Sequence, residues 1–141
     1  MDDNPGRELL RKWLEHKPKN FFTANPNLAD TIEANVGTEA LGSLRERLER
    51  FGAVVAVELE PLVADCERLE NLPILRAWSG IGERTEELEF HPSYYEAGRR
   101  IWASEILACR SRPGAAMEQA ALVYLASHQG EGGHVCPVAC T

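Results

Sequence analysis

The stretch TEALGSLRERLERF, residues 38–51, decides the fold class of this chain. Apolar residues recur in it at intervals of three, four and three positions: Leu41, Leu44, Leu48 and Phe51. This spacing places apolar side chains on one face of an α-helix. The charged residues between them are expected to cover the outside of the helix: Arg45, Glu46, Arg47, Glu49 and Arg50. We therefore expect an amphipathic helix that is capped at Thr38 and ended by Gly52.

The segment before this helix has the same period. Residues 7–16 carry an apolar face: Leu9, Leu10, Trp13 and Leu14. Asn25 followed by Pro26 is a typical helix start, with Asn as the cap and Pro at the first helical position. That second helix is expected to reach about Val36 and to end at Gly37.

The segment after residues 38–51 is also helical in pattern. Residues 53–69 begin with AVVAV, whose β-branched content would suit a strand, but the apolar and charged positions that follow fit a helix better. Pro61 is expected to bend or interrupt this helix. Residues 71–89 contain one proline and two glycines, so we expect them to form a connection.

The last part of the chain predicts further helices. Pro92 starts one that should run to about Cys109. Its apolar side comprises Tyr95, Trp102, Ile106 and Cys109. A turn at 111–114 precedes an Ala-rich helix over 115–129, which GEGG breaks, and residues 136–141 look like the start of a further apolar element. Because no segment is a convincing strand, we expect an all-α fold, a helical bundle of about six helices.

Composition and charge restrict the class of protein. The 141 residues are 44% apolar and 26% charged, which is typical of one globular domain. The net charge is −7, and no cluster of lysines and arginines supplies the basic stripe that nucleic-acid binding needs. The chain begins without a secretory signal, and no apolar stretch approaches the ~18 residues of a membrane helix. We therefore expect a cytoplasmic protein with reduced thiols and with neither nucleic acid nor membrane as a partner.

Four residues of the zinc-binding types lie within thirteen positions: His128, His134, Cys136 and Cys140. Structural zinc sites use two tight pairs separated by a long loop, whereas all four candidates here crowd one segment. No metal site is therefore predicted. A Cys136 nucleophile with His134 as its base is also disfavoured, because residues two apart point away from each other.

Two further motifs have structural interpretations. His91, directly before Pro92, is expected to be a helix-entry residue. Tyr94, Tyr95 and Trp102 are expected to be core aromatics on a helix rather than a platform on which bases stack.

Several segments, taken in order, resemble one family. They are FHPSYYE at 90–96, RPGA at 112–115 and GHVCPVACT at 133–141. They are similar to the amino-terminal helical region of acyl-CoA dehydrogenase superfamily flavoproteins, within the adaptive-response (AidB-type) branch. That branch carries Phe-His-Pro-x-aromatic and later Cys-Pro-x-x-Met-Thr, where this chain has Cys140 in place of Met. NFF at 20–22 also resembles the entry segment of the branch.

The resemblance implies a specific parent reaction. Members bind FAD between helical and β domains, usually as tetramers, and a carboxylate removes an α-proton from an acyl-CoA while the β-hydride passes to the flavin. Adaptive-response members are also associated with DNA repair, through their carboxy-terminal region. No residue of this chain matches a catalytic or cofactor-binding position of the family. Cys136, Cys140 and Thr141 would line the approach to the acyl pocket in a complete protein, although helix packing is the favoured interpretation.

These considerations predict an amino-terminal extension with a short helix at 1–19 and an acyl-CoA dehydrogenase-like helical domain at 20–141, truncated or encoded as a split piece. Alone, it should neither bind FAD nor oxidise acyl-CoA. Its expected partner is the remaining flavin-binding part of the protein or a second copy of itself, and acyl-CoA should bind only to a complete assembly. The alternative is a stand-alone helical interaction module without chemistry.

Overall fold

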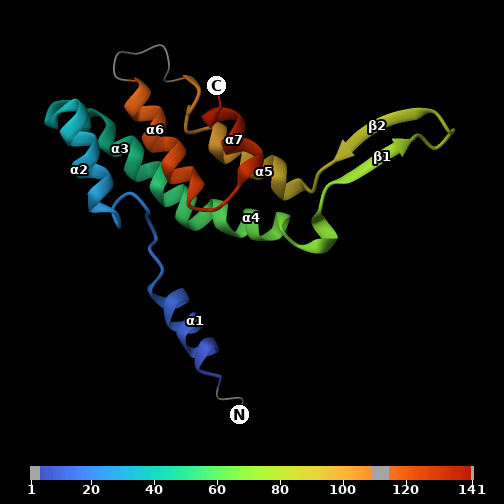
Figure 1. The fold of residues 1–141 in the computed structure, drawn as a ribbon, viewed down its shortest axis with the longest axis horizontal. Helices are drawn as coiled ribbons and strands as arrows, with labels where there is room; N and C mark the ends of the chain where they lie inside the picture. Colours follow the sequence, from blue (N-terminus) through green and yellow to red (C-terminus); the bar gives the residue numbers. More distant parts are fainter. Residues whose placement is uncertain (1–3, 109–114, 141) are drawn as a thin grey trace.

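The fold is mostly helical, with one β-hairpin (Figure 1). A computed structural model describes residues 4–108 and 115–140. In chain order its elements are α1 (Pro5–His16), α2 (Pro26–Val36), α3 (Thr38–Val54), a π-helical turn (Val55–Leu59), α4 (Glu60–Cys66), a 3-10 turn (Leu69–Asn71), β1 (Ile74–Trp78), β2 (Arg84–Glu89), α5 (Pro92–Trp102), α6 (Ala115–Ser127) and α7 (Gly132–Ala139).

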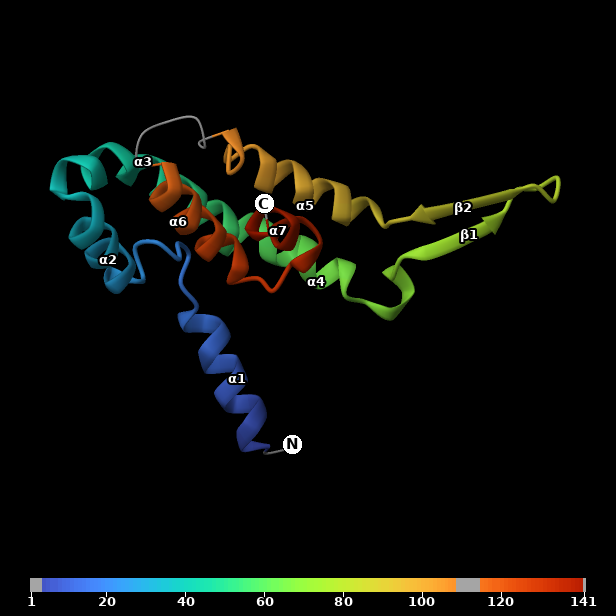
Figure 2. The same ribbon diagram turned by 45° about the horizontal axis from the view of Figure 1, so that its top comes forward.

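The core is built on the apolar stripe that the sequence predicted for α3. Leu41, Leu48 and Phe51 are buried, and Leu44 is half-buried against them. α3 packs on α2 and α6, α4 packs on α5, and α7 contacts both α5 and α6 (Figures 1 and 2). Burial of this stripe contributes to the hydrophobic driving force for folding.

One long helix runs from Thr38 to Cys66, so the helix predicted over residues 53–69 is confirmed as far as Cys66, and Gly52 does not end α3. Gly52 instead permits a close approach, because a β-carbon there would lie 2.5 Å from Oδ1 of Asn20. The wider π-helical turn comes directly before Pro61, which cannot donate a backbone hydrogen bond, and the helix continues through this proline.

The helix starts follow the predicted chemistry at one position and depart from it at another. The Asn25 side chain caps α2 by accepting from the backbone N–H of Leu28, with Pro26 as the first helical residue. Thr38, however, is already helical and does not cap α3. Its hydroxyl donates to Oε1 of Glu33 at 2.6 Å, and Gly37 is the cap residue.

The expectation of an all-α fold is wrong, because residues 74–89 form an antiparallel hairpin. Leu75 pairs with Leu88 and Arg76 pairs with Glu87, and a bulge lies beside Glu86, whose φ is +50°. The hairpin projects from the helical body in both views (Figures 1 and 2). The sequence did not predict this hairpin, because the charged residues of RTEELE and the glycines between the strands are typical of a loop.

The helix predicted from Pro92 to Cys109 is shorter than expected. α5 ends at Trp102, and turns follow in which Glu105 has a φ of +58°. The hydroxyl of Ser104 donates to the carbonyl of Ile101 at 2.6 Å, which satisfies one of the free carbonyls at the helix end. Cys109, the predicted turn at 111–114 and Thr141 lie outside the described residues.

The predicted amino-terminal helix is present as α1, and it stands apart from the helical body (Figure 1). None of its residues is buried, including the apolar face of its predicted pattern. The Lys17 side chain, just after α1, forms an ion pair with Glu60 and lies 5.5 Å above the ring of Trp13. None of the helices in the described residues combines the length and apolar character that a bilayer crossing requires.

Candidate functional site

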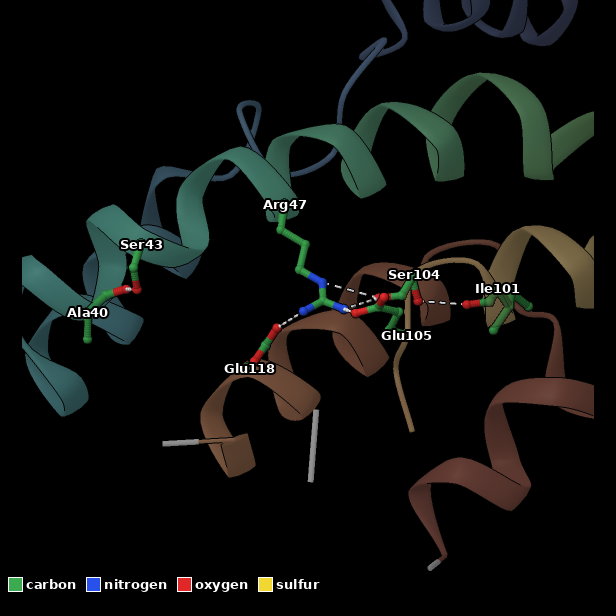
Figure 3. A network of polar contacts seen from close by, with 7 residues as sticks. All are labelled: Ala40, Ser43, Arg47, Ile101, Ser104, Glu105 and Glu118. Carbon is green, nitrogen blue, oxygen red and sulfur yellow. Dashed lines mark hydrogen bonds and ion pairs between the residues drawn. The ribbon is translucent and has the colours of Figure 1, made fainter. Parts of the chain in front are cut away.

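A half-buried arginine forms a network of polar contacts in the helical body (Figure 3). The Arg47 guanidinium points from α3 towards α6 and the turn after α5. It donates to Glu118 through Nη1, to Oε2 of Glu105 at 2.6 Å and to the carbonyl of Ser104 at 2.8 Å through Nη2. Because it joins three segments that are distant in sequence, this network fixes how they pack.

The prediction that Arg47 covers the outside of its helix is therefore wrong. The physical reason is Glu118, which is only 4% exposed and needs a cationic partner in the interior. α6 is otherwise apolar or weakly polar on all sides, so the single carboxylate within AAMEQAALVYLAS was the feature from which a buried ion pair could have been predicted. This feature indicates an ion pair, but it does not identify the arginine.

A groove of about 340 Å³ lies beside this network, between α3 and the end of α5. Its apolar floor includes Phe51, Val54 and Ala103. Arg100, at its edge, pairs with Glu58 at 3.1 Å and with Glu96 at 3.0 Å. Carboxylates thus neutralise two of the arginines that line the groove, Arg47 and Arg100, and Arg50 lines it as well.

A second polar cluster joins α4 to the start of α5. Ser93 donates to Oδ2 of Asp65 at 2.5 Å, and Nδ1 of His91 lies 3.4 Å from the same oxygen. This hydrogen bond is the main cause that lowers the pKa of Asp65; burial acts in the opposite direction, and the nearby Arg68 guanidinium adds to the lowering.

The same residue types form catalytic triads, but the arrangement here is different. Ser93 is buried, and it lies between the other two groups rather than at the end of a relay. Nδ1 of His91 also accepts from the backbone N–H of Ser93 at 3.3 Å, as a helix cap does. The prediction that His91 is a helix-entry residue is confirmed.

A third cluster packs α7 on α5. The His134 ring lies 4.2 Å from the ring of Tyr94 and 5.9 Å from that of Trp102, centroid to centroid. Nδ1 of His134 lies 3.2 Å from Oε2 of Glu131, whose carboxylate accepts from two backbone N–H groups and caps α7. Burial raises the pKa of Tyr94, and the charge of Glu131 adds to this effect.

The aromatic residues of α5 are less buried than the sequence predicted. Tyr94 is half-buried and stacks on Phe90, but Tyr95 is 54% exposed and Trp102 is 41% exposed. The assignment of all three to the core is therefore wrong for Tyr95 and Trp102. Both side chains are largely accessible to solvent, although the Trp102 ring still makes an edge contact with His134.

The four residues considered for zinc do not come together. His128 stacks on Phe21 at 4.8 Å, and His134 faces α5. Cys136 lines a groove between α6 and α7, and Cys140 follows one turn later. Across residues 4–108 and 115–140, no group of three or more His, Cys, Asp or Glu side chains could hold a metal ion.

The residues predicted at the approach to an acyl pocket lie at the carboxyl end of α7. Cys136 and Cys140 are both exposed, and the groove beside Cys136 has a volume of about 290 Å³. Thr141 is outside the described residues. The assignment of Cys136, Cys140 and Thr141 to an acyl pocket remains a prediction.

The fold and these clusters define a class of protein, a mostly helical domain whose polar networks tie its helices to one another and whose hairpin projects from the body. The family model described as the adaptive response protein AidB N-terminal domain matches residues 14–141. The chain belongs to this family, which confirms the resemblance to the AidB-type branch of the acyl-CoA dehydrogenase superfamily. No curated protein and no solved structure matches it.

Proposed function

We propose that this chain is the amino-terminal helical portion of an FAD-dependent, acyl-CoA dehydrogenase-like oxidoreductase of the adaptive-response type, acting in the cytoplasm. The family match over residues 14–141 supports this proposal. The chain contains no Thr-Glu-x-x-Gly-Ser-Asp segment of the kind that contacts flavin in the family. By itself, therefore, it binds no FAD and oxidises no acyl-CoA.

The observation that carries the proposal is the apolar surface of the hairpin. Large side chains are exposed along and beside both strands: Ile74, Leu75, Trp78, Ile81 and Leu88. A two-stranded hairpin is marginally stable in water unless something packs on it. Each such side chain that a partner covers contributes ~1.5–3 kcal/mol, so the hairpin is suited to be a contact surface.

In the proposed role, the helical body forms a rigid side of the substrate site, and the hairpin is the surface that contacts the partner. The buried Arg47–Glu118 pair holds α3 on α6, and the Asp65–Ser93 hydrogen bond holds α4 on α5. A rigid helical surface of this kind orients a thioester against a flavin and excludes water, while the cofactor supplies the redox chemistry. The partner is the flavin-binding part of the protein or a second copy of the chain.

Two measurements test the proposal. The absorption spectrum of the purified 141-residue chain, mixed with FAD and desalted, should show no retained flavin. Co-expression with the flavin-binding and carboxy-terminal segments of an adaptive-response flavoprotein should give a complex that co-purifies and retains flavin. Stoichiometric flavin on the chain alone, or turnover of an acyl-CoA by it, would overturn the proposal.

A hairpin variant tests this contact surface. Leu75 and Leu88 face each other across the strands, so Leu75→Ser with Leu88→Ser should abolish association as measured by sedimentation velocity. Arg76→Ser with Glu87→Ser is the matched control, because that neighbouring pair points to the opposite face of the hairpin. The control should associate as the parent chain does, and equal loss in both variants would contradict the assignment.

The alternative is a stand-alone helical interaction module without chemistry. The closed core around Leu48, Ile101 and Leu122 favours it, since these side chains are fully buried without any partner. The co-expression experiment distinguishes the two functions. A chain that ignores the flavin-binding segments but associates through its hairpin with itself or another protein is the module.

A further inference from the structure

Two thiols lie one helical turn apart on α7. The backbone N–H of Cys140 donates to the carbonyl of Cys136 at 3.0 Å, which closes the turn between them. Side chains four positions apart on a helix are neighbours, with β-carbons about 5–6 Å apart. Both cysteines are exposed, so their sulfur atoms can reach a common third atom from solvent.

An apolar groove adjoins this pair. It lies between α6 and α7, has a volume of about 290 Å³, and is lined by Val123, Val135 and Ala139 as well as Cys136. Cys140 directly follows Ala139, a lining residue of the groove, and is itself exposed. A ligand centre held by both sulfurs would therefore have room for one apolar substituent beside it.

The geometry restricts which chemistry the pair can perform. Two sulfur ligands are too few for a tetrahedral zinc site, and the His134 ring is turned away towards Tyr94 of α5. Oxidation by peroxide needs a thiolate, yet contact with Cys140 raises the pKa of Cys136 above its ordinary value. Both observations favour a soft centre that takes up protonated thiols and needs only two of them.

We propose that Cys136 and Cys140 form a dithiol site for trivalent monoorganoarsenicals, with the organic substituent in the groove between α6 and α7. Arsenic(III) makes three bonds in a pyramid, which matches two sulfurs and one apolar group. In the reaction with R–As=O, two As–S bonds form and the As=O bond breaks. The oxygen leaves as water with the two thiol protons, and the arsenic stays trivalent, so neither oxidant nor reductant is required.

Phenylarsine oxide is the probe. The reduced 141-residue chain is mixed with one equivalent, and intact mass, free-thiol titration and release by excess 2-mercaptoethanol are measured. We expect one arsenical per chain, loss of two thiols, and release slowed by ~10²-fold relative to either single-thiol variant, as two-point attachment gives. The dithiol 2,3-dimercaptopropanol should remove the arsenical.

Serine variants identify the site. Cys136→Ser and Cys140→Ser should each give fast release by 2-mercaptoethanol, while Cys66→Ser and Cys109→Ser should behave as the parent chain does. Matching thermal unfolding curves show that each variant is folded. Slow release from the Cys140→Ser variant, or fast release from the Cys66→Ser or Cys109→Ser variant, would overturn the assignment.

The groove has its own test. Methylarsine oxide forms the same two As–S bonds but carries a smaller apolar group, so it should be released faster than phenylarsine oxide from the parent chain. In the Cys136→Ser variant the two probes should be released at similar rates. Equal release from the parent chain would overturn the placement of the substituent in the groove.

Discussion

The His134 ring occupies the space that any side chain at Gly98 would need: a β-carbon on Gly98 would lie 2.5 Å from Nε2 of His134. Both residues are buried at the contact of α5 with α7. Two aromatic side chains contact the His134 ring, Tyr94 and Trp102, and Phe90 in turn stacks against Tyr94. The approach of α7 to α5 therefore depends on glycine at position 98.

Gly98→Ala should lower the free energy of unfolding by ~1–3 kcal/mol, because the added methyl group forces the His134 ring out of its contact. Urea denaturation of the chain measures this change. Gly42→Ala is the matched control, since Gly42 also lies within a helix but has no atom within 4 Å of its would-be β-carbon. That control should stabilise the chain by ~0.5–1 kcal/mol, and similar effects at the two sites would contradict the packing described.

Removing one partner of the buried ion pair should cost more than removing both. Arg47→Met removes the guanidinium that pairs with the buried Glu118 carboxylate and should destabilise the chain by ~3–5 kcal/mol, and the double variant with Glu118→Met should recover part of this loss. Denaturant unfolding and a double-mutant cycle measure the coupling. Arg11→Met, which breaks an exposed pair with Glu8, should change stability by under ~1 kcal/mol.

Acid should weaken the contact between α4 and α5. The pKa of Asp65 is lowered from its ordinary value of 3.8, chiefly by the hydrogen bond from Ser93, so the charged carboxylate favours the folded state. This stabilisation is present above pH 3.8 and is lost as the pH falls through the lowered pKa of the folded chain. In Ser93→Ala, the pKa of Asp65 should rise towards 3.8, as an NMR titration of its carboxyl carbon can show.

Thermal unfolding between pH 7 and pH 2 gives a second readout. The stability difference between the parent chain and Ser93→Ala should shrink as the pH falls below 3.8 and through the lowered pKa of the folded chain, because the hydrogen-bonded carboxylate of Asp65 is then progressively protonated. In an Asp65→Asn background, the effect of Ser93→Ala should no longer vary with pH over that range. A difference that persists unchanged to pH 2 would contradict the role of Asp65.

Hydrogen exchange should separate the hairpin from the helical body. Amides of β1 and β2 should exchange with small opening free energies in a dilute solution of the chain, because the strands are exposed on both faces. Amides around Leu48 in α3 should instead approach the global stability. Protection of the hairpin that rises with protein concentration indicates self-association, and strong protection at all concentrations would contradict its exposure.

Local pattern was sufficient to predict the helices but not their partners. The spacing of Leu41, Leu48 and Phe51 predicted the central helix and its buried face, and Asn25-Pro26 predicted the start of α2. These features depend on neighbouring residues alone. Gly52 shows the limit, because its role is a close contact with Asn20 from another segment, which periodicity cannot reveal.

The candidate site was harder to predict for the same reason. The pairing of Arg47 with Glu118 joins residues far apart in the sequence, and nothing in either helix distinguishes this arginine from its solvated neighbours. The hairpin at 74–89 was missed because its strands have no buried face, so the apolar–polar alternation that marks a strand is absent. The turn of Cys136 and Cys140 required the helical state of α7, which its short, Pro-containing sequence does not specify.

The π-helical turn at Val55–Leu59 determines which way the side chains of α4 face around the helix axis. Buried positions recur there in steps of four, at Val55, Leu59 and Val63, and in an ordinary α-helix each such step would drift by about 40° around the axis. The additional residue in the wide turn cancels this drift. The buried positions therefore stay in line along the helix, which packs on α2 and α6 through α3 and on α5 through α4. In regular α-helical winding the same three side chains would instead move progressively around the axis, by about 40° at each step of four residues.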